Sequence, residues 1–168
     1  MKWNKVEGVS GYRIYQYNSK TKEYKHIGSV TKGTSYKVSK LKPGTKYKFK
    51  VRAYKKDDGT IWGDYSKTFE TATKCLTPKI TSIASTSKGK VNLTWSNVTG
   101  ESGYQVYYAT KKNGDYKKVS SYKTDTLSGS KSKLTSNKTY YFKVRAYKKT
   151  DSGTVYGSFS DVKSIKIK

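Results

Sequence analysis

The sequence predicts an all-β protein built from two consecutive β-sandwich domains. First, the segment F-K-V-R-A-Y-K-K at Phe49–Lys56 recurs unchanged, 93 residues later, at Phe142–Lys149. Second, apolar and polar residues alternate within it, as in a strand with one face on a core and one in water. Third, turn-forming residues separate such segments at intervals of roughly ten residues, without helical periodicity.

The repeat sets the domain boundaries. A chain of 168 residues can form one large or two small domains, and the repeat favours two, at residues 1–73 and 74–168. The segment Thr73–Thr77 is short, so we interpret it as a linker that leaves the domains little freedom.

The two domains are predicted to begin differently. The second opens with a short strand at Pro78–Ile83 and an alternating strand at Val91–Trp95. The first has only Trp3, at the position that corresponds to Trp95. We therefore expect the first domain to lack its first strand and most of its second, and so to be truncated at its N-terminus.

The following elements are predicted in register in both domains. Paired strands are expected at Tyr12–Tyr17 and Tyr104–Ala109, at Tyr24–Val30 and Tyr116–Tyr122, and at Tyr65–Thr71 and Phe159–Ile167. Asp57–Gly59 and Asp151–Gly153 are predicted hairpin turns. A strand is also expected at Ser35–Val38, whereas its counterpart near Thr126–Lys133 is rich in Gly and Ser and poorly patterned.

The repeated strand is expected to divide its side chains between two faces. The inward set is Tyr47, Phe49, Val51 and Ala53, and the outward set is Lys48, Lys50, Arg52 and Tyr54. The inward set defines the fold, and any function would lie with the outward set.

Several motifs in order resemble fibronectin type III domains, in two tandem copies that span nearly the whole chain. They are Trp95 (and Trp3), the pattern G-Y-x-[IV]-Y, the segment L-x-P-G-T-x-Y-x-F-x-V-x-A, and G-x-[YF]-S before the last strand. The resemblance implies immunoglobulin-like sandwiches without a disulfide, with the Trp in the core and the hydroxyl of Tyr47 or Tyr140 bonded back to the preceding loop. It implies spacing, adhesion or ligand binding and no enzymatic activity. The content of Lys and Tyr is similar to that of repeats in Gram-positive surface and secreted proteins.

The charge favours anionic partners. The formal net charge is +25, with +11 in residues 1–73 and +14 in residues 74–168, so both domains are basic. Of the 36 basic residues 33 are Lys, which lacks the planar fork that Arg presents to phosphates and guanine, and this argues against a dedicated nucleic-acid reader. Lysine also keeps strands soluble and protects sheet edges. No apolar run is long enough to predict a membrane span.

Catalytic and metal chemistry find little support. His26 and Cys75 are the only residues of their kinds, which is too few for a zinc site, and Cys75 falls in the predicted linker. The pair Asp57 and Asp58 lies in a predicted turn, where Asp is favoured for local reasons. We predict no catalytic residue, no metal and no cofactor.

The candidate ligand-binding surface is the outward face of the sheet in each domain, where aromatic and basic residues alternate. It comprises Tyr15, Lys48, Lys50, Arg52, Tyr54 and Trp62 in the first domain, with Arg13 nearby, and Tyr107, Lys143, Arg145, Tyr147 and Tyr156 in the second. Rings between cations can stack sugars and hold anions. Alternatively, the same residues pair across strands and cover the sheet. Trp62 and Tyr156 are the strongest single candidates for binding.

Two main functional hypotheses follow, beside a third, non-specific nucleic-acid binding driven by charge, which the scarcity of Arg disfavours. One is a non-catalytic spacer or adhesion module of a larger extracellular or cell-surface bacterial protein, adjoining other domains and contacting anionic cell-wall polymers. The alternative is an accessory carbohydrate- or glycan-binding module of a secreted hydrolase or adhesin. If the first domain lacks its opening strands, we also expect it to be less stable than the second or to pair with another chain.

Overall fold

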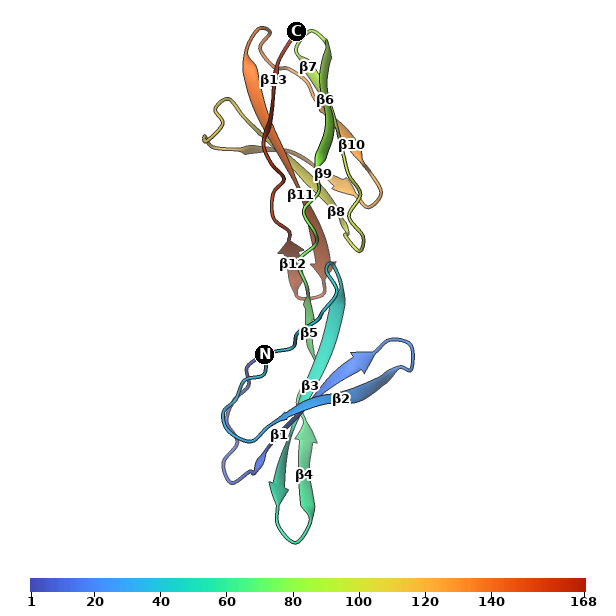
Figure 1. Cartoon of the computed structure of the whole chain (residues 1–168), viewed down its shortest axis with the longest axis vertical. Helices are drawn as coiled ribbons and strands as arrows, with labels where there is room; N and C mark the ends of the chain where they lie inside the picture. The colour runs from blue at the N-terminus through green and yellow to red at the C-terminus, as the bar shows by residue number, and fades with distance from the viewer. The chain divides into compact units, whose positions relative to one another are not determined.

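The computed structural model describes residues 1–168, which form thirteen β-strands and no helix. The chain divides into two compact units. The first unit comprises Met1–Leu41 and Lys46–Thr71, and the second comprises Lys42–Thr45 and Ala72–Lys168. The predicted all-β fold class is confirmed, and each unit is described separately below (Figure 1).

The second unit is a sandwich of two antiparallel sheets. One sheet has the order β10-β7-β6, from Ser128–Lys131, Lys90–Trp95 and Ile80–Ser87. The other has the order β12-β11-β8-β9, from Gly153–Tyr156, Thr139–Thr150, Gly103–Ala109 and Lys117–Lys123, with β13 (Lys163–Lys166) also on β11. Trp95, 2% exposed, lies in the core with Tyr104, Val106, Phe142 and Val144, as the resemblance implies.

The first unit contains a single sheet with the order β2-β1-β3-β4. These strands are Glu23–Val30, Gly11–Asn18, Lys46–Lys56 and Thr60–Tyr65, and β5 (Phe69–Ala72) pairs with β3. On the opposite side the only pairing is an isolated antiparallel bridge between Lys2 and Ser35. Trp3 packs against a small core of Tyr12, Ile14 and Val51.

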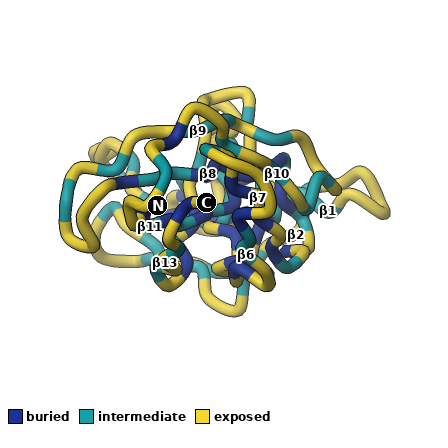
Figure 2. Tube along the Cα trace, turned by 90° about the horizontal axis from the view of Figure 1, so that it is seen from above, coloured by how far each residue is buried: buried dark blue, intermediate teal, exposed yellow.

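Buried residues are interspersed with partly buried and exposed ones, and most turn residues are exposed (Figure 2). Along much of β3 and β11 buried residues alternate with partly buried ones. In β7 the alternation is complete, with Val91, Leu93 and Trp95 buried and the residues between them exposed. This period of two is what a strand requires when one face lies on a core.

Two predicted strands differ from the structure. Ser35–Val38 forms only the bridge at Ser35, whereas the poorly patterned segment contains β10. β10 pairs with four residues of β7, and the first unit has no such strand to pair with. The partner, more than the local pattern, therefore determines which of the two segments becomes a strand.

The last predicted strand of each unit is also shorter than expected. Tyr65 ends β4, and β5 begins only at Phe69, after a short irregular segment. In the second unit Phe159 likewise precedes β13, which begins at Lys163. The intervening Ser66 and Ser160 donate backbone hydrogen bonds to β3 and β11 without continuing a strand.

The segment predicted as a linker is in part a core element. Cys75, in the predicted linker, is 5% exposed and packs in the core of the second unit with Ile80. Burial raises the pKa of its thiol, because an apolar environment disfavours the thiolate.

The bond expected at the tyrosine corner is present in the second unit. The N–H of Thr135, five residues before Tyr140, donates to the Tyr140 hydroxyl at 3.2 Å. Hydrogen bonding from the side chain and backbone of Thr135 lowers the pKa of the Tyr140 hydroxyl, since it stabilises the ionised form. In the first unit the Tyr47 ring stacks on Phe49, with the ring centroids 6.1 Å apart.

Candidate functional site

The outward face of β3 in the first unit carries a row of alternating rings and cations, which we call the first ladder. Its members are Trp62, Arg52, Tyr65, Lys50 and Tyr24. The Arg52 guanidinium lies 5.1 Å from the Trp62 ring centroid and 4.8 Å from that of Tyr65. The Lys50 ammonium lies 5.7 Å from Tyr65 and 4.6 Å from Tyr24. These distances are within the range of cation–π attraction.

The second unit repeats this arrangement position for position, in what we call the second ladder. Its members are Tyr156, Arg145, Phe159, Lys143 and Tyr116. Arg145 lies 3.9 Å from Tyr156 and 4.8 Å from Phe159, and Lys143 lies 4.4 Å from Phe159 and 3.8 Å from Tyr116. Desolvation raises the pKa of Tyr116, consistent with a ring that is partly covered.

Strand register places these residues side by side. In the first unit Arg52 pairs with Tyr65 and Tyr54 with Trp62 across β3 and β4, and Tyr15 pairs with Lys50 across β1 and β3. Cross-strand neighbours on one face lie close enough for long side chains to touch. The first ladder is therefore a consequence of strand register, whereas in the second ladder Tyr116 and Phe159 come from irregular segments that adjoin the sheet.

The flanking residues on β1 and β8 differ between the units. Arg13 adds a second guanidinium over Trp62, at 4.6 Å. At the corresponding position Gln105 accepts two hydrogen bonds from Arg145, at 3.1 and 2.9 Å. The Arg145 Nη2 also donates to the Tyr107 hydroxyl at 3.2 Å. The second ladder therefore has one flanking cation fewer than the first, because a neutral Gln105 stands in place of Arg13.

Tyr15 and Tyr107 are both brought to the ladders, as predicted. Tyr15 contacts the Tyr65 ring edge-on, with centroids 5.2 Å apart. Tyr107 makes the same contact with Phe159 at 5.1 Å.

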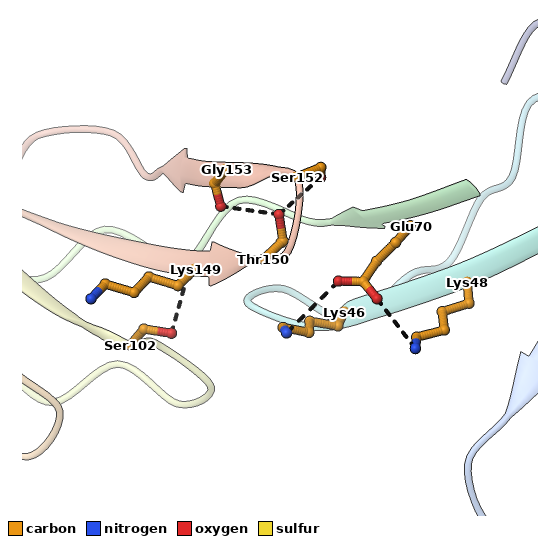
Figure 3. Close-up of polar contacts among 8 residues, drawn as sticks. All are labelled: Lys46, Lys48, Glu70, Ser102, Lys149, Thr150, Ser152 and Gly153. Carbon is orange, nitrogen blue, oxygen red and sulfur yellow. Dashed lines mark hydrogen bonds and ion pairs between the residues drawn. The ribbon is translucent and has the colours of Figure 1, made fainter. Parts of the chain in front are cut away.

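Lys48 lies on the same strand but is engaged elsewhere. Its ammonium lies 3.3 Å from one carboxylate oxygen of Glu70, and Lys46 lies 3.7 Å from the other (Figure 3). The Glu70 side chain is 13% exposed, so this pair is better shielded from solvent than an ordinary surface ion pair. Lys48 therefore belongs to a local ion-pair group and not to the ladder.

In the second unit the opposite end of the equivalent strand, the C-terminal end of β11, is held by hydrogen bonds among neutral groups. The Lys149 backbone N–H donates to the Ser102 hydroxyl at 3.1 Å. Thr150 Oγ1 lies 3.0 Å from Ser152 Oγ and donates to the Gly153 carbonyl, which closes the β11–β12 turn (Figure 3).

Two candidate residues do not face solvent as expected. Tyr54 and Tyr147 are each only 8% exposed, so their assignment to an open surface is wrong. The reason is a glycine on the neighbouring strand: the Tyr54 ring lies over Gly11 and the Tyr147 ring over Gly103, where any side chain would collide with it. Burial raises the pKa of the Tyr147 hydroxyl. Each ring contacts one ladder ring: Tyr54 lies 5.6 Å from Trp62 and Tyr147 lies 6.4 Å from Tyr156, between ring centroids.

The sequence reasoning missed four ladder rings: Tyr24, Tyr65, Tyr116 and Phe159. Their signal was present, because each pair occupies matching positions in the repeat. The alternation within one strand could not show it, since Tyr24 and Tyr65 come from neighbouring strands and Tyr116 and Phe159 from irregular segments.

Chemically, the ladders offer ring faces and cations on the outward face of a sheet. Tyr65 and Tyr156 are the most open rings, at 45% and 40% exposure. His26 lies near the first ladder on β2, where its Nε2 is 3.1 Å from Ser29 Oγ and its ring contacts Tyr15. The structure shows no group of three or more His, Cys, Asp or Glu side chains that could hold a metal ion. It also shows no helix long and apolar enough to cross a membrane.

Comparison with known proteins supports the fold. Residues 1–69 match the family described as fibronectin type III domain. The fold is that of tandem fibronectin type III domains. A two-domain fibronectin type III segment from chicken tenascin has a TM-score of 0.57 at 17% identity, over 98% of this chain and 89% of that one.

A second similar structure is that of the FN1–FN3 domains of chicken CNTN1. It has a TM-score of 0.50 at 24% identity and covers 99% of this chain. The chain spans 62% of the length of that structure. No curated protein sequence matches the chain. At these identities the structural likeness shows the fold alone.

Proposed function

We propose that the chain is a non-catalytic spacer or adhesion module of a larger extracellular or cell-surface bacterial protein, which contacts anionic cell-wall polymers. Fibronectin type III domains are commonly structural or spacer modules within larger proteins, and function in such a fold is set by its surfaces. The function of this chain therefore depends on its surface.

The observation that favours this function is how the cations are distributed. Of the 33 lysines 29 are exposed, on the turns and strands of both units. The partly buried ones are Lys50, Lys131, Lys143 and Lys148, of which the first three lie on aromatic rings. The ladder cations thus contact the protein's own aromatic rings. The exposed lysines form a diffuse positive surface without a shaped site.

A diffuse positive surface predicts weak attraction that depends on salt. Lysine is a hydrated point charge, and exposed charges more than about 8 Å from their partners are screened at physiological ionic strength. Such attraction can hold a spacer against a polyanion without fixing its orientation.

The test is retention of the whole chain on immobilised poly(glycerol phosphate), with a neutral glucan matrix as control, over a salt gradient. We expect retention on the polyanion alone, lost as salt is raised, and weakened by replacing Lys20, Lys22 and Lys25 with Glu. Retention unaffected by salt, or none at low salt, would contradict the proposal.

A glycan-binding module is the second candidate, favoured by the open rings of Tyr65 and Tyr156. It predicts salt-resistant retention on a glycan array that is lost in Trp62→Ala or Tyr156→Ala. The variants Trp62→Phe and Tyr156→Phe keep the ladder packed and serve as controls for folding. If the phenylalanine variants retain the glycan and the alanine variants lose it, the rings form a true binding surface.

A further inference from the structure

Two of the three arginines of the protein face each other on the outward side of the sheet in the first unit. Arg13 of β1 and Arg52 of β3 are directly opposite in the strand register. Both guanidiniums lie over the Trp62 ring, at 4.6 and 5.1 Å from its centroid. Like charges directly opposite each other across two strands destabilise a sheet. A negatively charged group placed between the two guanidiniums would remove this repulsion.

The second unit shows how an acceptor within the protein serves the equivalent arginine. Gln105 stands at the position of Arg13 and is 8% exposed. Its Oε1 accepts two hydrogen bonds from Arg145, and its Nε2 donates to the Ser121 hydroxyl at 3.3 Å. The Arg145 guanidinium is thus bonded to a neutral partner in the neighbouring strand.

The first unit has no such acceptor. Ser29 lies beside Arg13 in the register of β1 and β2, as Ser121 lies beside Gln105, so the row across three strands is Ser29, Arg13 and Arg52. No carboxylate forms an ion pair with either arginine. The row therefore brings a hydroxyl and two guanidiniums together without an acidic side chain.

The two guanidiniums differ in how much of each is free. Arg52 lies on the rings of Trp62 and Tyr65, and its Nε donates to the Gly63 carbonyl at 2.6 Å, so only its terminal nitrogens remain. Arg13 lies on one ring and donates no hydrogen bond within the protein. Both side chains are half-buried, so their positions are restricted without a ligand. Arg13 therefore offers a complete fork of donors, to which Arg52 adds its terminal nitrogens.

We propose that Arg13 and Arg52 bind a phosphate monoester group of a ligand, with Ser29 and Trp62 beside it. Guanidinium forks bind the oxygens of phosphate through parallel pairs of hydrogen bonds. The two charges of the pair match a doubly charged tetrahedral group, whereas a single fork already satisfies the two oxygens of a carboxylate. This site goes beyond the diffuse attraction of the exposed lysines, because it holds one group at a fixed place on the sheet.

The experiment titrates methyl phosphate into the whole chain at constant ionic strength and follows the arginine Nε–H and tryptophan indole signals by NMR. The pH is kept more than one unit above the second pKa of a phosphate monoester, about 6, so that the group carries two charges. We expect the Arg13, Arg52 and Trp62 signals to shift saturably. The Arg145 signal, from the second unit, is the internal control and should not move.

Three variants make the test specific. Arg13→Gln copies the second unit and should weaken binding at least about tenfold, because charge-assisted hydrogen bonds are lost. It should also raise the melting temperature of the first unit without ligand, since the repulsion is removed, and this shows that the variant folds. Arg13→Lys keeps the charge without the fork and should likewise weaken binding. Lys37→Gln, which removes an exposed charge of the same unit, should leave binding unchanged.

The proposal is overturned if no signal shifts, or if the Arg145 signal shifts in step with that of Arg13. It is also overturned if Arg13→Lys binds as tightly as the unaltered chain, since charge alone would then suffice, or if dimethyl phosphate, a singly charged diester, binds as tightly as methyl phosphate. The result is independent of retention on poly(glycerol phosphate), which Arg13→Gln should leave in place. Replacing Lys20, Lys22 and Lys25 with Glu should have the reverse effect, weakening retention and sparing the methyl phosphate site.

Discussion

The Val98 N–H donates to the Tyr104 hydroxyl as the Val6 N–H donates to the Tyr12 hydroxyl, but Val98 is 4% exposed and Val6 is 48% exposed. The effect of this exposure on the free energy of unfolding can be measured as a difference between two equivalent substitutions. In Tyr104→Phe the Val98 N–H loses its acceptor in a buried position. A buried donor left without a partner costs about 1–3 kcal/mol of unfolding free energy. The Asn97 oxygen, which accepts from the same hydroxyl, belongs to an exposed residue and can bond to water instead.

The equivalent Tyr12→Phe removes a bond of almost the same length but should cost less. Val6 is about half exposed, so water can replace the hydroxyl at its N–H. The hydroxyl also donates a long bond to the Val6 carbonyl, at 3.4 Å, which water can likewise replace. The expected loss is then the net value of a hydrogen bond open to water, about 0.5–1.5 kcal/mol. We therefore expect Tyr104→Phe to destabilise its unit by about 1 kcal/mol more than Tyr12→Phe destabilises its own.

The assay is urea unfolding of the whole chain, with the Trp3 and Trp95 indole signals reporting the two units separately. Tyr116→Phe is the control, because its hydroxyl donates to the Lys112 carbonyl in an exposed position. If Tyr12→Phe lowers the free energy of unfolding as much as Tyr104→Phe or more, the reasoning is refuted, since the greater exposure of Val6 would then have no energetic consequence.

Three other predictions follow from single sites. Gly103→Ala should lower the free energy of urea unfolding by about 2–4 kcal/mol, because φ is +145° and the added Cβ would lie 2.6 Å from the Tyr147 hydroxyl and closer still to the Tyr122 carbonyl. Gly8→Ala is the control: φ is +72° and the Cβ would meet no atom, so it should cost only about 1 kcal/mol. Native Cys75 should react with iodoacetamide at pH 8 more than about tenfold more slowly than in denaturant, because burial raises its pKa and blocks access; equal rates would contradict its place in the core. Burial raises the pKa of the Tyr104 and Tyr122 hydroxyls above their usual value near 10, as it raises that of the Cys75 thiol, so the unfolded state ionises first at all three. The melting temperature of the second unit should begin to fall near the ordinary pKa of a thiol, about 8.5, and fall further above about pH 10, and Tyr104→Phe should reduce the part of that fall above about pH 10.

Much of the fold follows from patterns that lie within single strands. Phe49 and Val51 are buried as their alternation predicts, and Trp95 lies in the core as the resemblance implies. What failed depends on a partner strand. Ser35–Val38 has a good strand pattern but no neighbour long enough to pair with, whereas Ser128–Lys131 has a poor pattern and a strand beside it. Hydrogen bonding across a sheet is non-local, so a pattern within four residues could not decide either case.

The candidate site shows the same division between local and non-local information. Alternation identified Lys50, Arg52, Lys143 and Arg145 as outward-facing, but it also placed Tyr54 and Tyr147 there. These two tyrosines are outward in the strand and yet buried, because each ring folds over a glycine of the adjacent strand. A face that is outward in a strand is therefore not the same as a face open to solvent.

The ladders also bear on which function the surface can serve. A cation that already lies on two rings must leave one of them, or share it, to hold a ligand, so Arg52 and Arg145 are poorer anion sites than their charge alone suggests. No exposed lysine lies on two rings in this way, although Lys46 and Lys48 are paired with Glu70. If the protein binds polyanions, the binding should therefore follow the lysines of the turns, and the ladders should act by keeping the sheet rigid beneath them. Replacing Arg145 with Lys tests this directly: it keeps the charge but loses the bonds to Gln105, and should lower stability without changing retention on a polyanion.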